Sequence, residues 1–489
     1  MTMKKPDYEW WIQHSHTDSA FLLLVDSPDL FEQAILSRLK EVKRKPNQGV
    51  INQATWRAIH EQDRFGSMSS IIQSIQPEPE VAPSRPFVGN LRTDQRALRD
   101  DQGSFPAVGV SAFWSPWAVK YNPGQLERLA EWARGCGITY VRWFGAHDWP
   151  GGTKPYNGNS VDPSYFLLMQ QTIDAFAAFG LRSQITMFTR RQMIKDAESL
   201  ARGWADLVKD NRDKVCLVEC VNEWNHTDND WSDNEVRAAS AAFQERCDVP
   251  FALSAPSAET WQDMKERLTH LNTGSSASAT TIHFPRKQTT GEGEWRWVRQ
   301  PWHGRWPIEG CPDFVVDNEH QRWDKSSSGR EVAVAAAAPL NAFIAGCGMS
   351  THHDVFGVHI NQGEYGSDLA SQRLQKVLSK VIPLLPPDVA NWQSTRVGEG
   401  GGPHPFPSLL NQQWSTEDTD TGVSRSFAAV RGDDFVMCLN GVRGSVTLHE
   451  SHPKKFRVIS LDDGVTIHEG HGPTRLSEVD GQAFYVGTM

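Results

Sequence analysis

The sequence lacks any apolar run long enough to cross a membrane, and the longest early one, Phe21 to Val25, is too short for the core of a signal peptide. It also lacks an excess of positive charge. The 489 residues include 49 Lys and Arg and 59 Asp and Glu, which gives a formal net charge of -10. Nucleic acids bind to basic surfaces. We therefore expect no membrane span, no Sec signal and no nucleic-acid partner, which leaves the location open between the cytoplasm and release by a non-Sec route.

Cysteine and tyrosine are both scarce. The seven cysteines are odd in number, and Cys216, Cys220 and Cys438 lie within apolar, strand-like runs. This pattern favours reduced core residues over a disulfide framework. Tyrosine occurs 7 times against 19 tryptophans. Because the flat indole ring buries a large apolar area and carries one donor, the excess of Trp suits either a large core or the apolar faces of sugar rings.

The composition changes several times along the chain. Asp29 to Lys43 carries apolar residues at helical spacing after a capping Asp, and Gly49 to Ile59 faintly resembles peptidoglycan-binding modules. A Pro-rich stretch follows, and the C-terminal part contains short β-rich runs separated by turns such as Asp462-Asp463-Gly464. We predict a mostly helical region over 1–75, a linker over 76–87, a central domain over 88–388 and a small β-sandwich domain over 395–489.

The central domain alternates apolar, strand-like runs with helical ones such as Ala197–Lys209, which is typical of parallel βα units. Eight such repeats over roughly 270 residues fit a (β/α)8, or TIM, barrel. A doubly wound open sheet is the alternative, but it would carry a Gly-rich loop after its first strand, where this chain reads SAFWSPW. The expected strands are Ala107–Phe113, Tyr140–Gly145, Ser183–Phe188, Val215–Asn222, Phe251–Ser254, Thr280–Phe284, Phe314–Asn318 and Gly348–His353.

Two glutamates end the fourth and seventh expected strands. Glu223 and Glu319 are 96 residues apart (319 − 223), close to the roughly 93 residues that three βα units of average length occupy. Barrel enzymes place their chemistry at the C-terminal ends of strands, and glycoside hydrolysis requires two carboxyl groups, about 5–5.5 Å apart in retaining enzymes. We therefore expect Glu223 and Glu319 to act as a pair, although Asp317 on the same strand is a possible substitute for Glu319.

In these motifs the chain resembles clan A glycoside hydrolases, especially the family 5-like cellulases and mannanases. The resemblance covers about residues 88 to 385. It rests on Asn222-Glu223, on Glu319, on Gly137-Ile-Thr-Tyr-Val-Arg142 and on Ile282-His283-Phe284, each at the strand where that clan carries the corresponding motif.

The resemblance implies a role for each of these residues. Glu223 would be the general acid/base and Glu319 the nucleophile of a retaining double displacement, with no cofactor. Arg142 would support the nucleophile, Asn222 would bind a sugar hydroxyl or orient the carboxylate, and His283 would bind substrate or orient the acid/base. Arg142 and His283 also have structural alternatives, as a partner of the buried Glu219 and as a core histidine.

The chain departs from the family pattern at the eighth strand. Family 5 often has a Trp there, whereas this chain reads Ser350-Thr-His-His-Asp354. We expect His352 or Asp354 to bind sugar hydroxyls. A metal-dependent hydrolase is the alternative for this histidine cluster, but the H-x-H motif that it would need at the first strand is missing, so no metal is expected.

Tryptophans gather near the expected strand ends, and Trp114, Trp143 and Trp224 are the expected sugar contacts. The long segment from Arg286 to Gly310 holds four more and is expected to form a lid or a subsite wall. The resulting hypothesis is a monomeric or homodimeric enzyme with a carbohydrate substrate. A catalytically silent glycan-binding barrel, such as a phage or cell-envelope adhesin, is the alternative. The ten strand-end tryptophans are Trp114, Trp117, Trp143, Trp149, Trp224, Trp295, Trp297, Trp302, Trp306 and Trp323.

Overall fold

The computed structural model describes residues 88–283, 308–319, 332–396, 410–412, 427–432, 434–448, 455–471 and 475–487. The expected helical region over 1–75, the linker over 76–87 and nearly all of the segment from Arg286 to Gly310 lie outside these residues. The chain divides into two compact units, and one of them, Val81–Gly366 with Ala370–Met489, contains both the barrel and the C-terminal strands.

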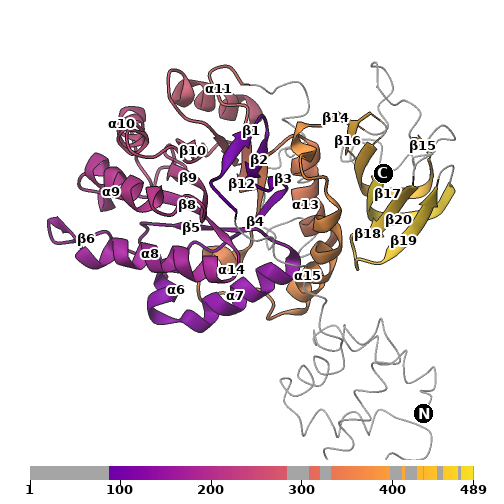
Figure 1. The fold of residues 1–489 in the computed structure, drawn as a ribbon, viewed down its shortest axis with the longest axis horizontal. Coiled ribbons are helices and arrows are strands. Elements are labelled where there is room, and N and C mark those ends of the chain that lie inside the picture. Colours follow the sequence, from indigo (N-terminus) through magenta and orange to yellow (C-terminus); the bar gives the residue numbers. More distant parts are fainter. Residues whose placement is uncertain are drawn as a thin grey trace, which may run out of the picture. The chain divides into compact units, whose positions relative to one another are not determined.

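The eight expected strands all form, each ending within two residues of its predicted bounds. They make one sheet of eight parallel strands, in the order β10-β9-β8-β5-β4-β13-β12-β11, which curves into a nearly closed barrel ringed by helices (Figure 1). The predicted TIM barrel is therefore confirmed. The strands are β4 (Ala107–Ser111), β5 (Tyr140–Phe144), β8 (Arg182–Phe188), β9 (Val215–Val221), β10 (Phe251–Ala252), β11 (Thr280–His283), β12 (Val315–Glu319) and β13 (Met349–His352).

The barrel closes between β10 and β11 without a strand ladder. The backbone N–H groups of Ser278 and Ala279 both donate to the carbonyl of Phe251, at 3.0 Å each. The Phe251 N–H donates in turn to the Ser278 hydroxyl, at 2.9 Å. These bonds satisfy the edge groups of the short β10, as closure of a barrel requires.

The helices cover the outside of the barrel with apolar faces. In α9, for example, Trp204, Ala205 and Val208 are fully buried, and the side chain of Asp196 caps the first turn. The helices are α6 (Ser115–Tyr121), α7 (Pro123–Cys136), α8 (Pro163–Ala178), α9 (Ala197–Lys209), α10 (Asp233–Gln244), α11 (Trp261–Asn272), α13 (Val332–Ile344), α14 (Val355–Val358) and α15 (Leu369–Val381).

The N-terminal end of the barrel is closed by a three-stranded sheet, β1 (Arg92–Asp94), β2 (Ala97–Asp100) and β3 (Gly103–Phe105). Leu98 and Phe105 pack against apolar side chains inside the barrel. Beside them, the buried Arg182 donates to Asp100 at 2.9 Å. The chemistry-bearing strand ends are therefore left at the opposite end of the barrel.

Helix α13 (VAVAAAAPLNAFI) is apolar on all sides, and all 13 of its residues are buried. It contacts β16 (Phe427–Arg431), β17 (Asp434–Leu448) and β20 (Arg475–Gly487) of the C-terminal region as well as β13 of the barrel. A helix that is hydrophobic all round must be covered on more than one face, and here the barrel and the C-terminal sheet share that task.

The C-terminal region is β-rich, as expected. Instead of the two sheets of a sandwich, its described strands form one antiparallel sheet of seven strands (yellow in Figure 1). The reason is that β17 and β20, of 15 and 13 residues, pair with each other along most of their length, with register shifts at two points. The other strands are β14 (Gln393–Arg396), β15 (Leu410–Gln412), β18 (Lys455–Ser460) and β19 (Thr466–His471).

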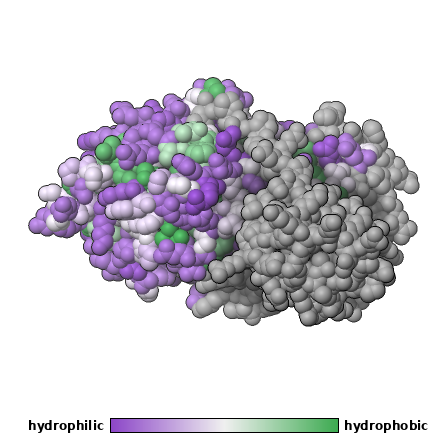
Figure 2. All heavy atoms as spheres, turned by 90° about the horizontal axis from the view of Figure 1, so that it is seen from below, coloured by the Kyte–Doolittle hydropathy of each residue, from purple (hydrophilic) through white to green (hydrophobic). Residues whose placement is uncertain are grey.

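On the face shown in Figure 2, the coloured surface is mostly hydrophilic, with hydrophobic residues in small, separated patches. The large apolar side chains exposed among the described residues are Val88, Tyr121, Leu167 and Val465, which are scattered along the chain. None of the described helices is both long enough and apolar enough to span a bilayer.

Candidate active site

A buried charge network lies inside the barrel, with Arg142 of β5 at its centre. The guanidinium is 0% exposed and donates to Glu319 Oε1 at 2.6 Å, to Glu219 Oε2 at 3.1 Å and to Asn222 Oδ1 at 2.8 Å. Burial alone lowers the pKa of Arg142, but the carboxylates of Glu319 and Glu219 outweigh it and raise the pKa above its usual value. The arginine therefore stays charged and holds three acceptors in fixed positions, from β9, from the residue that follows it and from β12.

Glu219 is the structural member of this network. It is 0% exposed, and both of its carboxylate oxygens are satisfied, which confirms the prediction of a buried charge paired with a basic residue. Its further donors come from several parts of the barrel, so the carboxylate joins these parts by hydrogen bonds. They are Thr186 Oγ1 at 2.8 Å, Thr281 Oγ1 at 2.7 Å, Asn318 Nδ2 at 2.9 Å and the Ala255 N–H at 3.1 Å.

Glu223 and Glu319 come together at His283, at the end of β11. Nδ1 of His283 lies 3.0 Å from Glu223 Oε1, and Nε2 lies 3.8 Å from Glu319 Oε1. The two carboxyl groups thus contact opposite nitrogens of one imidazole ring. The side chain of Glu319 is 6% exposed and that of Glu223 is 19% exposed. The structure therefore brings together Glu223, Glu319, Arg142, Asn222 and His283, and the catalytic and binding roles expected of them stay predictions.

The backbone at Glu223 takes a conformation that aims this side chain. Its φ of 42° is unusual for a residue with a side chain. Asn229 holds the turn, because its Nδ2 donates to the carbonyls of Asn222 at 2.6 Å and of Glu223 at 3.1 Å. The His226 N–H also donates to the Glu223 carbonyl, at 2.9 Å. The direction of the carboxyl group is therefore set by a sharp, braced turn.

The eighth strand contributes His353, which the sequence reasoning did not select. Nε2 of His353 lies 3.6 Å from Glu319 Oε2, and Nδ1 lies 3.1 Å from Ser111 Oγ. The expected His352 is directed the other way, toward the rings of Trp132 and Tyr365 on the helical side. Successive side chains alternate along a strand, so His353, and not His352, lies beside the carboxyl pair.

Asp354 likewise has a structural role in the fold. It is fully buried, and its carboxylate caps helix α14 by accepting from the Val355 N–H at 2.8 Å. The expectation that Asp354 binds a sugar hydroxyl is therefore replaced by a capping role.

Asp317 does not substitute for Glu319. Its carboxylate accepts from the Ser350 hydroxyl at 2.9 Å and is 0% exposed. The pairing of β11 with β12 shifts register between Ile282 and His283, so that His283 pairs with Glu319. This irregularity breaks the simple alternation that put Asp317 and Glu319 on the same side.

The three tryptophans expected to contact sugar are buried instead. Trp114 is 1% exposed and donates to the Phe356 carbonyl at 2.8 Å, and Trp224 is 4% exposed and donates to Asp233 at 2.7 Å. Trp143 is 0% exposed and packs against Trp204 of α9, on the helical side of the sheet. In this structure none of the three presents a free face, and they belong to the core. Trp295, Trp297, Trp302, Trp306 and Trp323 lie outside the described residues.

His147 follows the end of β5 and was not predicted as a site residue. It is 0% exposed, and its Nε2 lies 3.1 Å from the Phe113 carbonyl. Burial lowers the pKa of His147 from 6.5 to about 3, so the ring is neutral at physiological pH. Its ring packs against Trp149 and Phe144 beside the strand ends.

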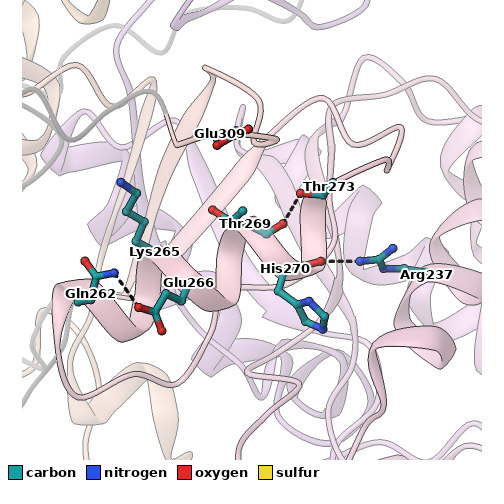
Figure 3. Close-up of a pocket in the computed structure, with 8 residues that line it drawn as sticks. All are labelled: Arg237, Gln262, Lys265, Glu266, Thr269, His270, Thr273 and Glu309. Carbon is teal, nitrogen blue, oxygen red and sulfur yellow. Dashed lines mark hydrogen bonds between the residues drawn. The ribbon is translucent and has the colours of Figure 1, made fainter.

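A cavity of about 690 Å³ lies away from the strand ends, along α10 and α11 (Figure 3). Its polar groups bond to one another: Arg237 donates to the His270 carbonyl, and Gln262 donates to Glu266 at 2.7 Å. It is lined by outer helices and reaches Thr273 beyond the end of α11, so it does not meet the two glutamates. Among the described residues, no cluster of three or more His, Cys, Asp or Glu side chains could hold a metal ion.

No protein-family model matches the sequence, and no curated protein is significantly similar to it. A putative glycoside hydrolase from Bacteroides vulgatus matches the structure with a TM-score of 0.52 at 11% identity, over 84% of this chain and 83% of that one. A GH30 endoxylanase from Clostridium papyrosolvens (TM-score 0.48, 10% identity) covers 82% of this chain and 98% of its own. Endo-glycoceramidase II from Rhodococcus sp. (TM-score 0.41, 12% identity) covers 80% and 99%. At these identities the likeness is one of fold, and at that level the resemblance to glycoside hydrolases is confirmed.

Proposed function

We propose that this chain is a retaining glycoside hydrolase that cleaves β-glycosidic bonds of an oligo- or polysaccharide. The observation that carries the proposal is the meeting of Glu223 and Glu319 on the two nitrogens of His283, with Glu319 held by Arg142. Glycoside hydrolysis uses two carboxyl groups that flank one bond, and these two lie against the same imidazole ring although they belong to well-separated strands.

In the first step, Glu319 attacks the anomeric carbon while Glu223 donates its proton to the leaving oxygen, so that a glycosyl-enzyme ester forms and the glycosidic bond breaks. The 2.6 Å contact with Arg142 fixes the attacking carboxylate. In the second step, Glu223 takes a proton from water, the water oxygen attacks the anomeric carbon, and Glu319 leaves.

His283 suits both steps because it contacts both carboxyl groups. A nitrogen that carries a proton donates to a neighbouring carboxylate, and a bare one accepts from a protonated carboxyl. His353 approaches Glu319 at its other oxygen, which leaves Oε1 to Arg142 and His283. We therefore assign both histidines as positioning residues for the carboxyl pair.

The test compares Glu223→Gln and Glu319→Gln with a matched surface change, Glu198→Gln, on a panel of 4-nitrophenyl β-glycosides and β-linked polysaccharides. Glu198 is about half exposed and lies on α9. Both site variants should lose polysaccharide turnover while remaining folded, and Glu198→Gln should match the wild type. The product should keep the anomeric configuration of the substrate by NMR. Near-normal hydrolysis by Glu319→Gln would remove its assignment as nucleophile.

A further inference from the structure

A cavity of about 320 Å³ lies at the N-terminal end of the barrel, beside the small sheet of β1, β2 and β3. Its walls are the segments that lead into β4, β5 and β8 and the turns that follow α15. This volume lies within the range of small-molecule sites, about 300–1,000 Å³. The two glutamates are at the other end of the barrel, and the seven residues of β8 alone separate the two ends by about 20 Å.

Most of the cavity wall is apolar. Four large apolar residues line it and are themselves almost fully buried, namely Phe105, Ile138, Ile382 and Leu385. Three prolines from the same segments also line it. Removal of apolar surface from water is favourable, so this wall suits a ligand that has an apolar body.

The charge in the cavity wall is positive. Arg134 and Arg182 are the two charged residues among the described residues that line it. Arg182 is neutralised, because it donates to the buried carboxylate of Asp100 at 2.9 Å and to the Asp213 carbonyl at 3.1 Å. The side chain of Arg134, in contrast, has no hydrogen-bond or ion-pair partner within the part of the chain that the structure describes, and its Nε atom is buried without an acceptor. One positive charge in the described lining therefore has no counter-charge.

The place of Arg134 in the fold does not account for its guanidinium. The residue lies in the last turn of α7, where a basic side chain can donate to the free carbonyl groups of a helix end. Backbone groups already do this here, because the Gly137 N–H donates to the Arg134 carbonyl at 2.9 Å and the Ile138 N–H donates to the Ala133 carbonyl at 3.0 Å. Buried donors without a partner are rare and costly in folded proteins. A guanidinium without a partner in the wall of a cavity therefore points to an acceptor that comes from outside the chain.

We propose that this cavity is a binding site for a small carboxylate with an apolar body, such as an aromatic acid. The carboxylate accepts hydrogen bonds from the Arg134 guanidinium, which matches a carboxylate in shape and in charge. The apolar body of the ligand lies against the apolar wall. A simple anion leaves that wall unused, and a neutral aromatic molecule leaves the positive charge unpaired. The site is separate from the two glutamates and does not depend on the function proposed for them.

Calorimetry on the full-length protein compares phenylacetate with 2-phenylethanol, a neutral molecule of nearly the same size, and with acetate, which has the charge without the ring. Phenylacetate should show saturable binding below about 10 mM. It should bind about tenfold or more tightly than either of the others, because 2-phenylethanol lacks the charged hydrogen bond and acetate lacks the apolar contact. Absence of saturable phenylacetate binding, or equally tight binding of 2-phenylethanol or of acetate, overturns the proposal.

Arg134→Met removes the charge and keeps a stem of similar length. The variant should fold, because the side chain is only partly buried and has no ion pair to lose, and the denaturation midpoint checks this. Phenylacetate should bind to it about tenfold or more weakly than to the wild type, while the affinity for 2-phenylethanol should stay the same. Arg246→Met is the matched control, because Arg246 also follows the end of a helix, α10, but lies outside the cavity. Equal phenylacetate affinity of Arg134→Met and Arg246→Met overturns the assignment.

Glu319→Gln shows at which end of the barrel phenylacetate binds. Glu319 lies at the end of β12, whereas the cavity lies at the start of β4, β5 and β8. The affinity of Glu319→Gln for phenylacetate should therefore equal that of the wild type. A change of tenfold or more in this variant would place the ligand beside the carboxyl pair and overturn the proposal.

Discussion

Replacing Arg142 by methionine should damage both stability and chemistry, because this side chain neutralises two buried carboxylates. Methionine approximates the length of the arginine stem but provides no charge and no donor. Glu219 keeps four other hydrogen-bond donors in the variant. Glu319, 6% exposed, loses the guanidinium 2.6 Å away. Breaking a buried ion pair on one side costs about 3–5 kcal/mol, and a misplaced nucleophile costs on the order of 100-fold in kcat.

Arg182→Met is the matched control for this prediction. Arg182 is as deeply buried and pairs with Asp100 at 2.9 Å, but it lies at the closed end of the barrel. Guanidinium denaturation followed by tryptophan fluorescence should show losses of similar size, about 3–5 kcal/mol, in both variants. At a temperature where both are folded, only Arg142→Met should lose kcat.

The double variant Arg142→Met/Glu319→Gln makes the reasoning refutable. Because the second substitution replaces the unpaired carboxylate of Glu319 by a neutral amide, the free energy of unfolding should be about 1–3 kcal/mol higher than in Arg142→Met alone. An Arg142→Met protein with the wild-type denaturation midpoint would refute the buried network. An equal loss of kcat in Arg182→Met would show that the effect on chemistry is only an effect of lower stability.

Three further predictions follow from single contacts. His353→Gln should lower kcat about 10-fold or more because Glu319 loses a neighbour that positions it, whereas His352→Gln should lower stability and change kcat/KM much less. Steady-state kinetics and denaturation of both variants separate the two effects. A larger loss of kcat in His352→Gln than in His353→Gln would contradict the register of β13. Burial lowers the pKa of His147 to about 3, so below pH 6.5 the unfolded chain binds a proton at this residue and the folded chain does not. The free energy of unfolding should therefore decrease as the pH is lowered from about 6.5 to 3. Between pH 7 and pH 5, His147→Gln should lose about 2 kcal/mol less of this free energy than the wild type, and identical pH dependence of the two proteins would contradict this. All seven cysteines are free and six are buried. A thiol reagent should therefore titrate seven thiols in guanidinium and few in the native protein, where Cys311 should react first. Fewer than seven reactive thiols in denaturant would indicate a disulfide.

The barrel could be predicted because each buried strand is a short apolar run bounded by turns, and because the helices between them carry apolar residues at helical spacing. The spacing of Glu223 and Glu319 followed from the regular length of βα units. Local sequence determines these features, so they are readable without a structure.

The errors lie where the direction of a side chain depends on a shift of one residue. His352 and His353 are chemically identical in the sequence, and only the pairing of β13 decides which one faces Glu319. The register shift beside His283 likewise decides that Glu319, and not Asp317, lies beside that histidine. Trp114, Trp143 and Trp224, near three strand ends, are buried in the core rather than exposed beside the two glutamates, and composition cannot distinguish these two roles. The single C-terminal sheet depends on β17 pairing with β20, a contact between segments far apart in the chain.

Helix α13 limits how this protein can be taken apart. A barrel expressed without the C-terminal strands would turn a surface of alanine and valine toward water, next to β13 of the barrel. The C-terminal sheet therefore covers the apolar surface of α13 in addition to forming a folded region of its own. A chimaera that exchanges this sheet for an unrelated domain would have to cover the same apolar surface of α13, and shortened versions of the protein made for kinetic assays should retain the sheet.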